Sequence, residues 1–468
     1  MLKRVSGFHE TLSDGAIAHL EEGIRIADAS FPAPFPRTLE YNAPAHGTWN
    51  IVHIGMAVPQ SHSIYVCSDN CLRGVVMTAA EMGCRDRFSS VMLRERDVQV
   101  DNLETITIEG VSDVIRNLPK EPPVVFVFLV CLHIFTGSDE DYIFRELGRR
   151  FPQIRFVKGY MDCIRQKEGP TPDMKLRMAA FGIIQPVRKN PARVNLLGSD
   201  VPFDRDCELI TLLSSNRFEV KQIYDCDDFE QFLALGDAAV NVCTYPNACQ
   251  AVKDLSERTS AGFVYLSAAV SFDEIRAQIK ALSDVCGRDL ASKDWMREQE
   301  RTCIAALQEL AEDLHDWTVA IDYTAHSRPL GIAKLLIQHG IFVECVFLDA
   351  ILEEEQEAFD WLKEHCPDLR LVPTIQPGMV LYGRGKDVVT SGRRVIALGQ
   401  KAAWFCQSGH FVNIIEGGGL WGYQGIRDLC ALLRQAKEEE LDYKRMIPKK
   451  GIGWPSLCST VVSTQPEE

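Results

Sequence analysis

Three cysteines in the first third of the sequence have the residue type and spacing to bind metal. Cys67 and Cys71 lie in the segment VCSDNC, where an apolar run gives way to a helical pattern, and Cys131 ends the apolar run VVFVFLVC. A thiolate at the start of a helix is stabilised by the helix dipole and by free backbone N–H groups. The same N–H groups can bond the sulfides of an iron–sulfur cluster. The alternative is that each cysteine is a buried thiol in the core.

A cubane [4Fe–4S] cluster takes four thiolates. Two cysteines from each copy of a symmetric pair would supply that number. We therefore expect Cys71 and Cys131 to bind metal at the interface of a dimer.

Three further residues at strand ends are candidates for catalysis. Cys243 ends the strand pattern of VNVC, and His326 and Arg328 follow the apolar run that begins at Trp317. A histidine with a nearby arginine at a strand end could donate a proton or bind an anion. Two alternatives stay open: Cys243 is a buried thiol, or the His326 segment is a polar loop in which Ser327 caps the next helix.

The elements that must position these residues alternate between strand and helix along most of the chain. That alternation predicts an α/β fold of three open parallel-sheet, Rossmann-like domains around a central cleft. We expect an N-terminal arm at 1–45, followed by three α/β domains at 46–190, 191–315 and 316–445. A loose tail at 446–468 would end the chain. Open sheets of this kind bind ligands at the carboxyl ends of their strands.

Composition sets limits on the class of protein. The chain has 468 residues, 16 cysteines and a formal net charge of -15, and no basic face indicates nucleic acid as a partner. No apolar run approaches the ~20 residues that cross a bilayer, and no signal peptide is evident. We therefore expect a cytoplasmic protein without a membrane partner. There is no G-x-x-x-x-G-K-[ST] loop, so the chain is not expected to hydrolyse ATP by that route.

Several segments, in a fixed order, resemble one protein family. They are SIYVCSDNCLRGVV, SVMLRERDVQVDNLETITIEGV, VVFVFLVCLHIFTGSDED, DVVTSGRRVIALGQKAAWF and GGGLWGYQGIRDL. Together they resemble the nitrogenase component 1 family over roughly residues 45–440. Cys71 matches the second cluster cysteine of the family, and Cys131, followed by Gly137 and Asp139, matches the third. Glu95 and Asp97 match its acidic segment.

Departures from the family pattern bear on function. The family's first cluster cysteine would fall in HGTWNIVHIG, which contains none, so a four-iron cluster fits better than an eight-iron one. Because the fourth ligand varies among relatives, Cys67 is a candidate extra cofactor ligand. Cys243 lies beside the position of the nitrogenase cofactor cysteine, but His410 is the nearest histidine to the second ligand position and comes too early. These departures do not favour dinitrogen reduction.

The resemblance implies the catalytic-component subunit of a nitrogenase-like reductase that works anaerobically. Such an oxidoreductase takes electrons from a separate P-loop ATPase with its own iron–sulfur cluster and transfers them through a [4Fe–4S] cluster to a small-molecule substrate or a second metallocofactor. The partner chain would be an identical copy or a paralogous subunit. Two alternatives remain: a scaffold for metallocofactor assembly, and a cluster-free structural partner subunit.

Overall fold

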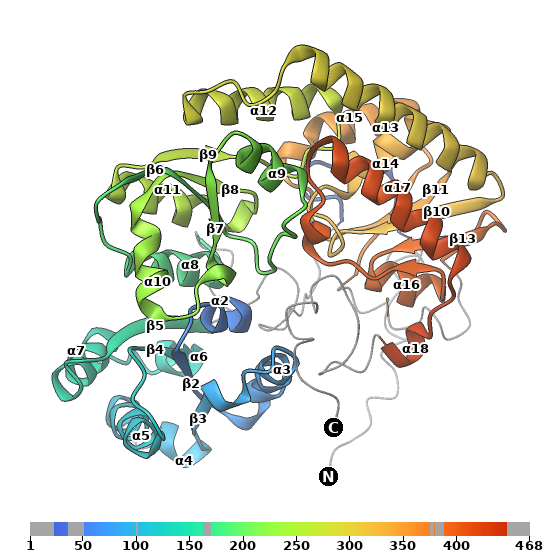
Figure 1. Cartoon of the computed structure of the whole chain (residues 1–468). Coiled ribbons are helices and arrows are strands. Elements are labelled where there is room, and N and C mark those ends of the chain that lie inside the picture. Colours follow the sequence, from blue (N-terminus) through green and yellow to red (C-terminus); the bar gives the residue numbers. More distant parts are fainter. Residues whose placement is uncertain are drawn as a thin grey trace, which may run out of the picture.

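The computed structural model describes residues 23–35, 51–99, 102–161, 170–374, 379 and 388–446. Within these residues the strands form three separate sheets, each built from one stretch of sequence apart from a short strand near the N-terminus (Figure 1). All strand pairs are parallel except one at an edge. The predicted fold class of several open parallel-sheet units is therefore confirmed.

The first sheet has four strands in the order β3-β2-β4-β5. Every residue of the two central strands, β2 and β4, is buried, because helices cover both faces. The strands are β2 (Ser61–Cys67), β3 (Phe88–Met92), β4 (Val124–Val130) and β5 (Arg155–Met161). The helices are α2 (Ile51–Ala57), α3 (Asp69–Glu81), α4 (Glu95–Gln99), α5 (Leu103–Asn117), α6 (Cys131–Phe135), α7 (Glu140–Arg150) and α8 (Pro172–Gly182).

The second sheet also has four strands, in the order β7-β6-β8-β9. Its strands are β6 (Asn190–Leu197), β7 (Glu219–Gln222), β8 (Ala238–Cys243) and β9 (Gly262–Tyr265), and its helices are α9 (Glu208–Ser215), α10 (Phe229–Leu233) and α11 (Cys249–Thr259). Helix α8 packs against β5 of the first sheet and against α11 of the second, so it links the two units.

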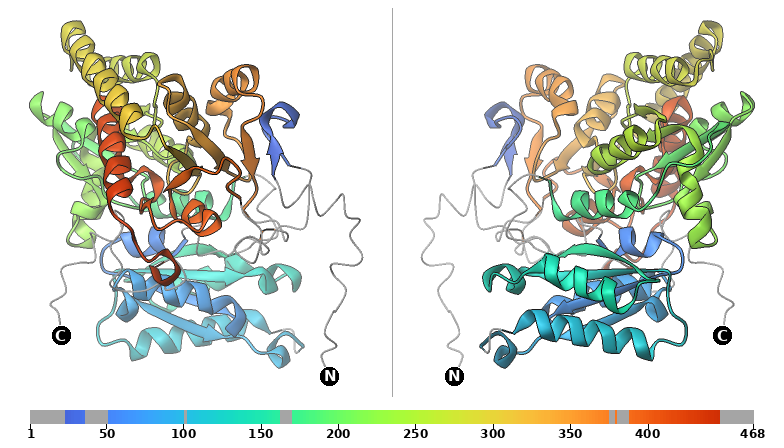
Figure 2. Two further views of the ribbon diagram at one scale, coloured as in Figure 1. Left: turned by 90° about the vertical axis from the view of Figure 1, so that its right-hand side faces the viewer. Right: turned by 90° about the vertical axis from the view of Figure 1, so that its left-hand side faces the viewer.

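The third sheet has six strands in the order β1-β12-β11-β10-β13-β14. Its strands are β10 (Trp317–Asp322), β11 (Val343–Phe347), β12 (Arg370–Val372), β13 (Arg394–Leu398) and β14 (Phe411–Val412), and its helices are α14 (Pro329–Gln338), α15 (Gln356–His365), α16 (Gln400–Cys406), α17 (Gly422–Glu438) and α18 (Tyr443–Met446). The edge strand β1 (Ile24–Arg25) comes from the predicted irregular arm and pairs antiparallel with β12 (Figure 2). The predicted loose tail lies, beyond Met446, outside the described residues.

Two long helices join the second and third units. Helices α12 (Phe272–Cys286) and α13 (Lys293–Asp313) run across the top of both sheets in Figure 1. The Cys303 thiol of α13 donates to the Tyr423 carbonyl oxygen of α17 at 3.1 Å. One continuous apolar core contains side chains of the second and third sheets, and a second core contains side chains of the first and second. Apolar packing therefore fixes how the three units sit together.

In the described part of the chain, no helix is both long enough and apolar enough to span a bilayer.

Candidate functional site

The structure brings two of the predicted ligand cysteines to one edge of the first sheet. Strands β2 and β4 are parallel neighbours, with Val66 opposite Leu129, so both strands end side by side. Cys71 follows β2 in the first turn of α3, and Cys131 follows β4 as the first residue of α6. Both side chains are partly exposed. The two thiols therefore lie at the same, solvent-facing edge.

Hydrogen bonds hold the turns that carry these cysteines. The Cys71 N–H donates to the Ser68 carbonyl at 3.0 Å, and the Ser68 hydroxyl lies 3.7 Å from the Cys71 sulfur. On the other turn, buried His133 contacts the Val130 carbonyl at 3.2 Å and the Thr107 hydroxyl at 3.0 Å. Burial lowers the pKa of His133, so its ring is neutral and braces the start of α6.

Cys67 differs from the other two cysteines. It is the last residue of β2, and its side chain is fully buried. Burial raises the pKa of the Cys67 thiol to about 12, with a smaller contribution from Cys71. Its role as an extra ligand stays a prediction, which this burial does not favour.

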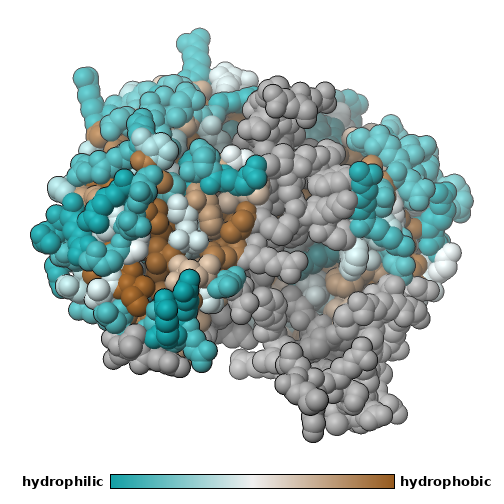
Figure 3. Space-filling model, turned by 90° about the horizontal axis from the view of Figure 1, so that it is seen from below, coloured by the Kyte–Doolittle hydropathy of each residue, from teal (hydrophilic) through white to brown (hydrophobic). Residues whose placement is uncertain are grey.

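Three exposed apolar side chains lie on the elements that carry or adjoin the two cysteines. Val76 on α3, Met92 at the end of β3 and Phe135 at the end of α6 are 40%, 38% and 67% exposed. Figure 3 views the molecule from the side on which the first sheet lies, and hydrophobic residues gather there in one area. Exposed apolar patches commonly mark protein interaction sites.

Cys243 lies at the end of the second sheet, in the apolar core that this sheet shares with the first. It is the last residue of β8, is fully buried, and donates its S–H to the Tyr245 carbonyl at 3.3 Å. Burial raises the pKa of this thiol to about 12. Gly198, with a φ of +102°, passes close over the thiol: a Cβ there would lie 2.4 Å from the Cβ of Ala248 and 3.3 Å from the Cys243 sulfur.

A buried ionic group lies next to Cys243. Arg177 of α8 donates to the Gly198 carbonyl at 2.7 Å and pairs with Asp200 at 2.5 Å. Its guanidinium carbon lies 5.0 Å from the centroid of the Tyr245 ring. The Asp200 N–H in turn donates to the Glu416 carboxylate at 3.4 Å. Glu416 precedes α17, so residues of all three units meet here.

His326 lies on the other side of the Glu416 loop. Its Nδ1 accepts the Arg328 N–H at 3.1 Å, and its ring would be 3.3 Å from a Cβ at Gly417. Burial, reinforced by Arg328, lowers the pKa of His326 to about 4, so the ring is neutral with its proton on Nε2. With Val270, Leu420 and Trp421, among others, His326 lines a cavity of about 10 Å³, roughly the room for one water molecule.

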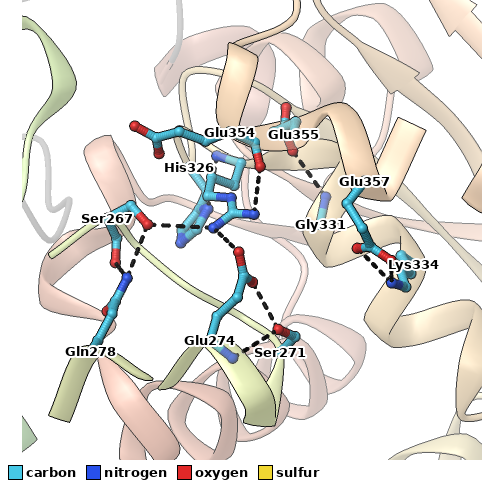
Figure 4. A network of polar contacts seen from close by, with 11 residues as sticks. Ser267, Ser271, Glu274, Gln278, His326, Gly331, Lys334, Glu354, Glu355 and Glu357 are labelled. Carbon is cyan, nitrogen blue, oxygen red and sulfur yellow. Dashed lines mark hydrogen bonds and ion pairs between the residues drawn. The ribbon is translucent and has the colours of Figure 1, made fainter. Parts of the chain in front are cut away.

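Arg328 joins three segments in a polar network, of which Ser267, Glu274 and Glu354 are labelled in Figure 4. It pairs with Glu274 of α12 at 2.8 Å and donates to the Glu354 carbonyl at 2.9 Å and to the Ser267 hydroxyl at 3.4 Å. These contacts tie α12 to the segment before α15. Arg328 thus holds the second and third units together around His326. No hydrogen bond joins His326 to Cys243.

Residues 44–376 match the family model for nitrogenase component 1 type oxidoreductases. The chain belongs to this family. Two similar solved structures are titled nitrogenase Cp1 at pH 6.5 and at pH 5. They have TM-scores of 0.61 and 0.53 and identities of 13% and 11%, and the matches cover 86% of this chain and 94% and 91% of theirs. At that identity they show the fold alone. No curated protein matches the sequence significantly.

One further polar group of this nitrogenase component 1 type oxidoreductase was missed from sequence. Lys401 in the first turn of α16 donates to the Tyr323 hydroxyl at 2.7 Å and to the Thr374 hydroxyl at 2.8 Å. The Thr374 N–H donates to Asp349 at 2.6 Å. All four residues follow strands of the third sheet, around the point where the strand order reverses between β10 and β13. The sequence did carry a sign of this group. Gly399 follows strand β13 directly and precedes helix α16, whose second residue is Lys401.

Proposed function

We propose that this chain is the catalytic-component subunit of a nitrogenase-like reductase. It takes electrons from a separate ATP-dependent iron–sulfur reductase and delivers them to a small-molecule substrate between its sheets, in the cytoplasm and under anaerobic conditions. Family membership supports the oxidoreductase class. The observation that carries the proposal is that Cys71 and Cys131, which are 60 positions apart in the sequence, reach one exposed edge of the first sheet.

These two cysteines fit an iron–sulfur cluster in their chemistry. Both are partly exposed thiols in the first turn of a helix, where backbone N–H groups favour thiolates. They supply two of the four thiolates that a cubane takes, so a second chain, identical or paralogous, supplies the rest. The apolar residues Val76, Met92 and Phe135 around them suit burial against that chain. A [4Fe–4S] cluster held there supplies one-electron transfer.

The proposed substrate region lies where the three units meet, around the Arg177–Asp200–Glu416 group. Cys243 and His326 stand on either side of the Asp200–Glu416 contact, and both are buried. A neutral His326 can donate a hydrogen bond or a proton from Nε2, while the Cys243 thiol is held in its protonated form. Rotation of the His326 ring would break its hydrogen bond from the Arg328 N–H, and rotation of the Cys243 side chain would break its bond to the Tyr245 carbonyl.

Anaerobic purification with iron and sulfide counted per chain tests the proposal. We expect about two irons per chain, one cubane for every two chains, and an EPR signal after dithionite reduction. Cys71→Ala and Cys131→Ala should each abolish the iron with the fold intact by circular dichroism. The matched control is Cys243→Ala, also at a strand end, which should retain it.

The remaining outcomes separate the rival functions. Near-zero iron in the wild-type chain under strict anaerobiosis would refute the redox proposal and favour a cluster-free structural partner. A third outcome is an iron content well above two per chain, with the excess lost on Cys243→Ala. That result would indicate a second metallocofactor, which is what a scaffold for cofactor assembly would carry.

A further inference from the structure

A histidine in the core of the first unit uses both of its ring nitrogens. His133 of α6 is 1% exposed, its Nδ1 lies 3.2 Å from the Val130 carbonyl oxygen, and its Nε2 lies 3.0 Å from the Thr107 hydroxyl. Because a carbonyl can only accept, Nδ1 carries the proton and donates, and in the neutral ring Nε2 accepts from Thr107. Neither nitrogen of His133 is therefore left to bind a metal ion itself.

The hydroxyl of Thr107 on α5 is committed to this histidine. Thr107 is fully buried. Buried hydroxyls on helices commonly bond the backbone carbonyl four positions earlier, as Ser112 does on the same helix and Thr259 does on α11. The Thr107 hydroxyl bonds His133 instead, 26 positions along the chain. The Thr107–His133 pair thus links α5 to α6.

The carbonyl that His133 holds belongs to the residue before a predicted ligand. Val130 ends β4, and Cys131 is the first residue of α6. Because a trans peptide is planar, its C=O and N–H groups point in opposite directions. Holding the Val130 carbonyl against the His133 ring therefore fixes the peptide plane that carries the Cα of Cys131. The His133 carbonyl in turn accepts the Ser138 N–H at 2.9 Å, which holds the far end of the turn.

We propose that His133 is a positioning residue for the iron–sulfur cluster: bonded to Thr107 and to the Val130 carbonyl, it holds Cys131 in place as a ligand. The proposal rests on the function proposed above, which supplies the cluster. Support is needed because α6 has only five residues, and a helix that short is not stable by itself. Residues that orient metal ligands commonly contribute about 10–100-fold to metal affinity.

Hydrogen–deuterium exchange of the full chain without iron tests whether the pair holds the turn. Thr107→Val removes the hydroxyl and keeps the branched shape, so the His133 ring loses one of its two anchors. We expect the amides of residues 131–138 to exchange about tenfold faster, and Thr107→Ser, which restores a hydroxyl, to return them to within about threefold of the wild-type rate. The matched control is Thr259→Val, the same substitution at a buried threonine whose hydroxyl bonds its own helix, and it should leave these amides unchanged.

Two results of the exchange measurement would overturn the proposal. One is a wild-type rate for these amides in a folded Thr107→Val chain. The other is exchange as fast in Thr107→Ser as in Thr107→Val, because packing and not the hydrogen bond would then hold the turn.

The rate of iron release measures the effect on the cluster. Chains purified anaerobically are mixed with the ferrous-iron chelator bathophenanthroline disulfonate. Thr107→Val should release iron about tenfold faster than the wild type, whereas Thr107→Ser and Thr259→Val should release it at close to the wild-type rate. A wild-type iron content with an unchanged release rate in Thr107→Val would overturn the positioning role and leave the proposed function standing. A wild-type chain without iron would overturn both, so the two failures are distinguishable.

Discussion

The substitution Asp322→Asn should loosen the site with almost no change in shape. Asp322 is fully buried at the end of β10, and its two oxygens serve opposite sides. One accepts the N–H groups of Thr324 at 2.8 Å and Ala325 at 3.2 Å, and the other accepts the Ala402 N–H of α16 at 2.9 Å. This single carboxylate thus fixes both the loop that leads to His326 and the helix turn that carries Lys401.

The expected cost follows from the hydrogen bonds. Asparagine can accept hydrogen bonds only through its single amide oxygen. If that oxygen keeps the bonds from Thr324 and Ala325, the amide nitrogen faces the Ala402 N–H, and two donors then oppose each other. Losing a charge-assisted bond and leaving a buried N–H without an acceptor costs about 3 kcal/mol. That free energy corresponds to about a hundredfold faster amide exchange at Ala402 if α16 opens locally.

Hydrogen–deuterium exchange with mass spectrometry, resolved to peptides of α16, measures this effect. The matched control is Asp316→Asn, the same substitution near the start of the same strand, where the side chain is 78% exposed; its exchange should match the wild type. If exchange in α16 of Asp322→Asn rises less than about threefold, under 1 kcal/mol, the assignment of Asp322 as the common acceptor is wrong.

Two other predictions concern buried acids. Burial raises the pKa of the Glu355 carboxyl from 4.5 to about 8. The stability that protonated Glu355 contributes is therefore fully present below the unfolded-state pKa and is lost as pH rises through about 8. The free energy of unfolding should fall by up to about 5 kcal/mol over this range. In urea unfolding followed from pH 5 to 9, Glu355→Gln should flatten this decline, whereas Glu357→Gln at an exposed ion pair should not; a decline equally steep in Glu355→Gln contradicts the prediction. Gly422 has a φ of +69°, and a Cβ there would lie 2.4 Å from a carboxylate oxygen of buried Glu208, so Gly422→Ala should destabilise by at least about 2 kcal/mol. Gly148→Ala, which meets nothing within 4 Å in a helix, should be neutral or stabilise by up to about 1 kcal/mol in the same assay, and equal effects of the two would count against the steric reasoning.

Much of the architecture could be predicted from sequence because the central strands are buried on both faces. Continuous apolar runs such as Val124–Val130 stand out from any helical pattern. Convergence of Cys71 and Cys131 was predictable for a related reason, since parallel strands with helical crossovers end at one edge.

Other elements were hidden by local preference. Helix α5 begins LETITIEG, and its β-branched residues resemble a strand. Packing decides the matter, because Leu103, Thr107, Val111 and Ile115 share one buried face. The Arg177–Asp200–Glu416 group could not be found from spacing, since Asp200 and Glu416 are 216 positions apart. The one local sign was a glutamate before three glycines.

The apolar cores that cross both junctions determine how the chain can be handled. Separating the second sheet from either neighbour would expose side chains such as Val240 or Val252 to water. Recombinant fragments cut between the sheets should therefore aggregate or fail to fold. Because opening either junction would expose these cores, we expect a ligand to reach the interior by movement of loops and side chains and not by hinged opening of the units.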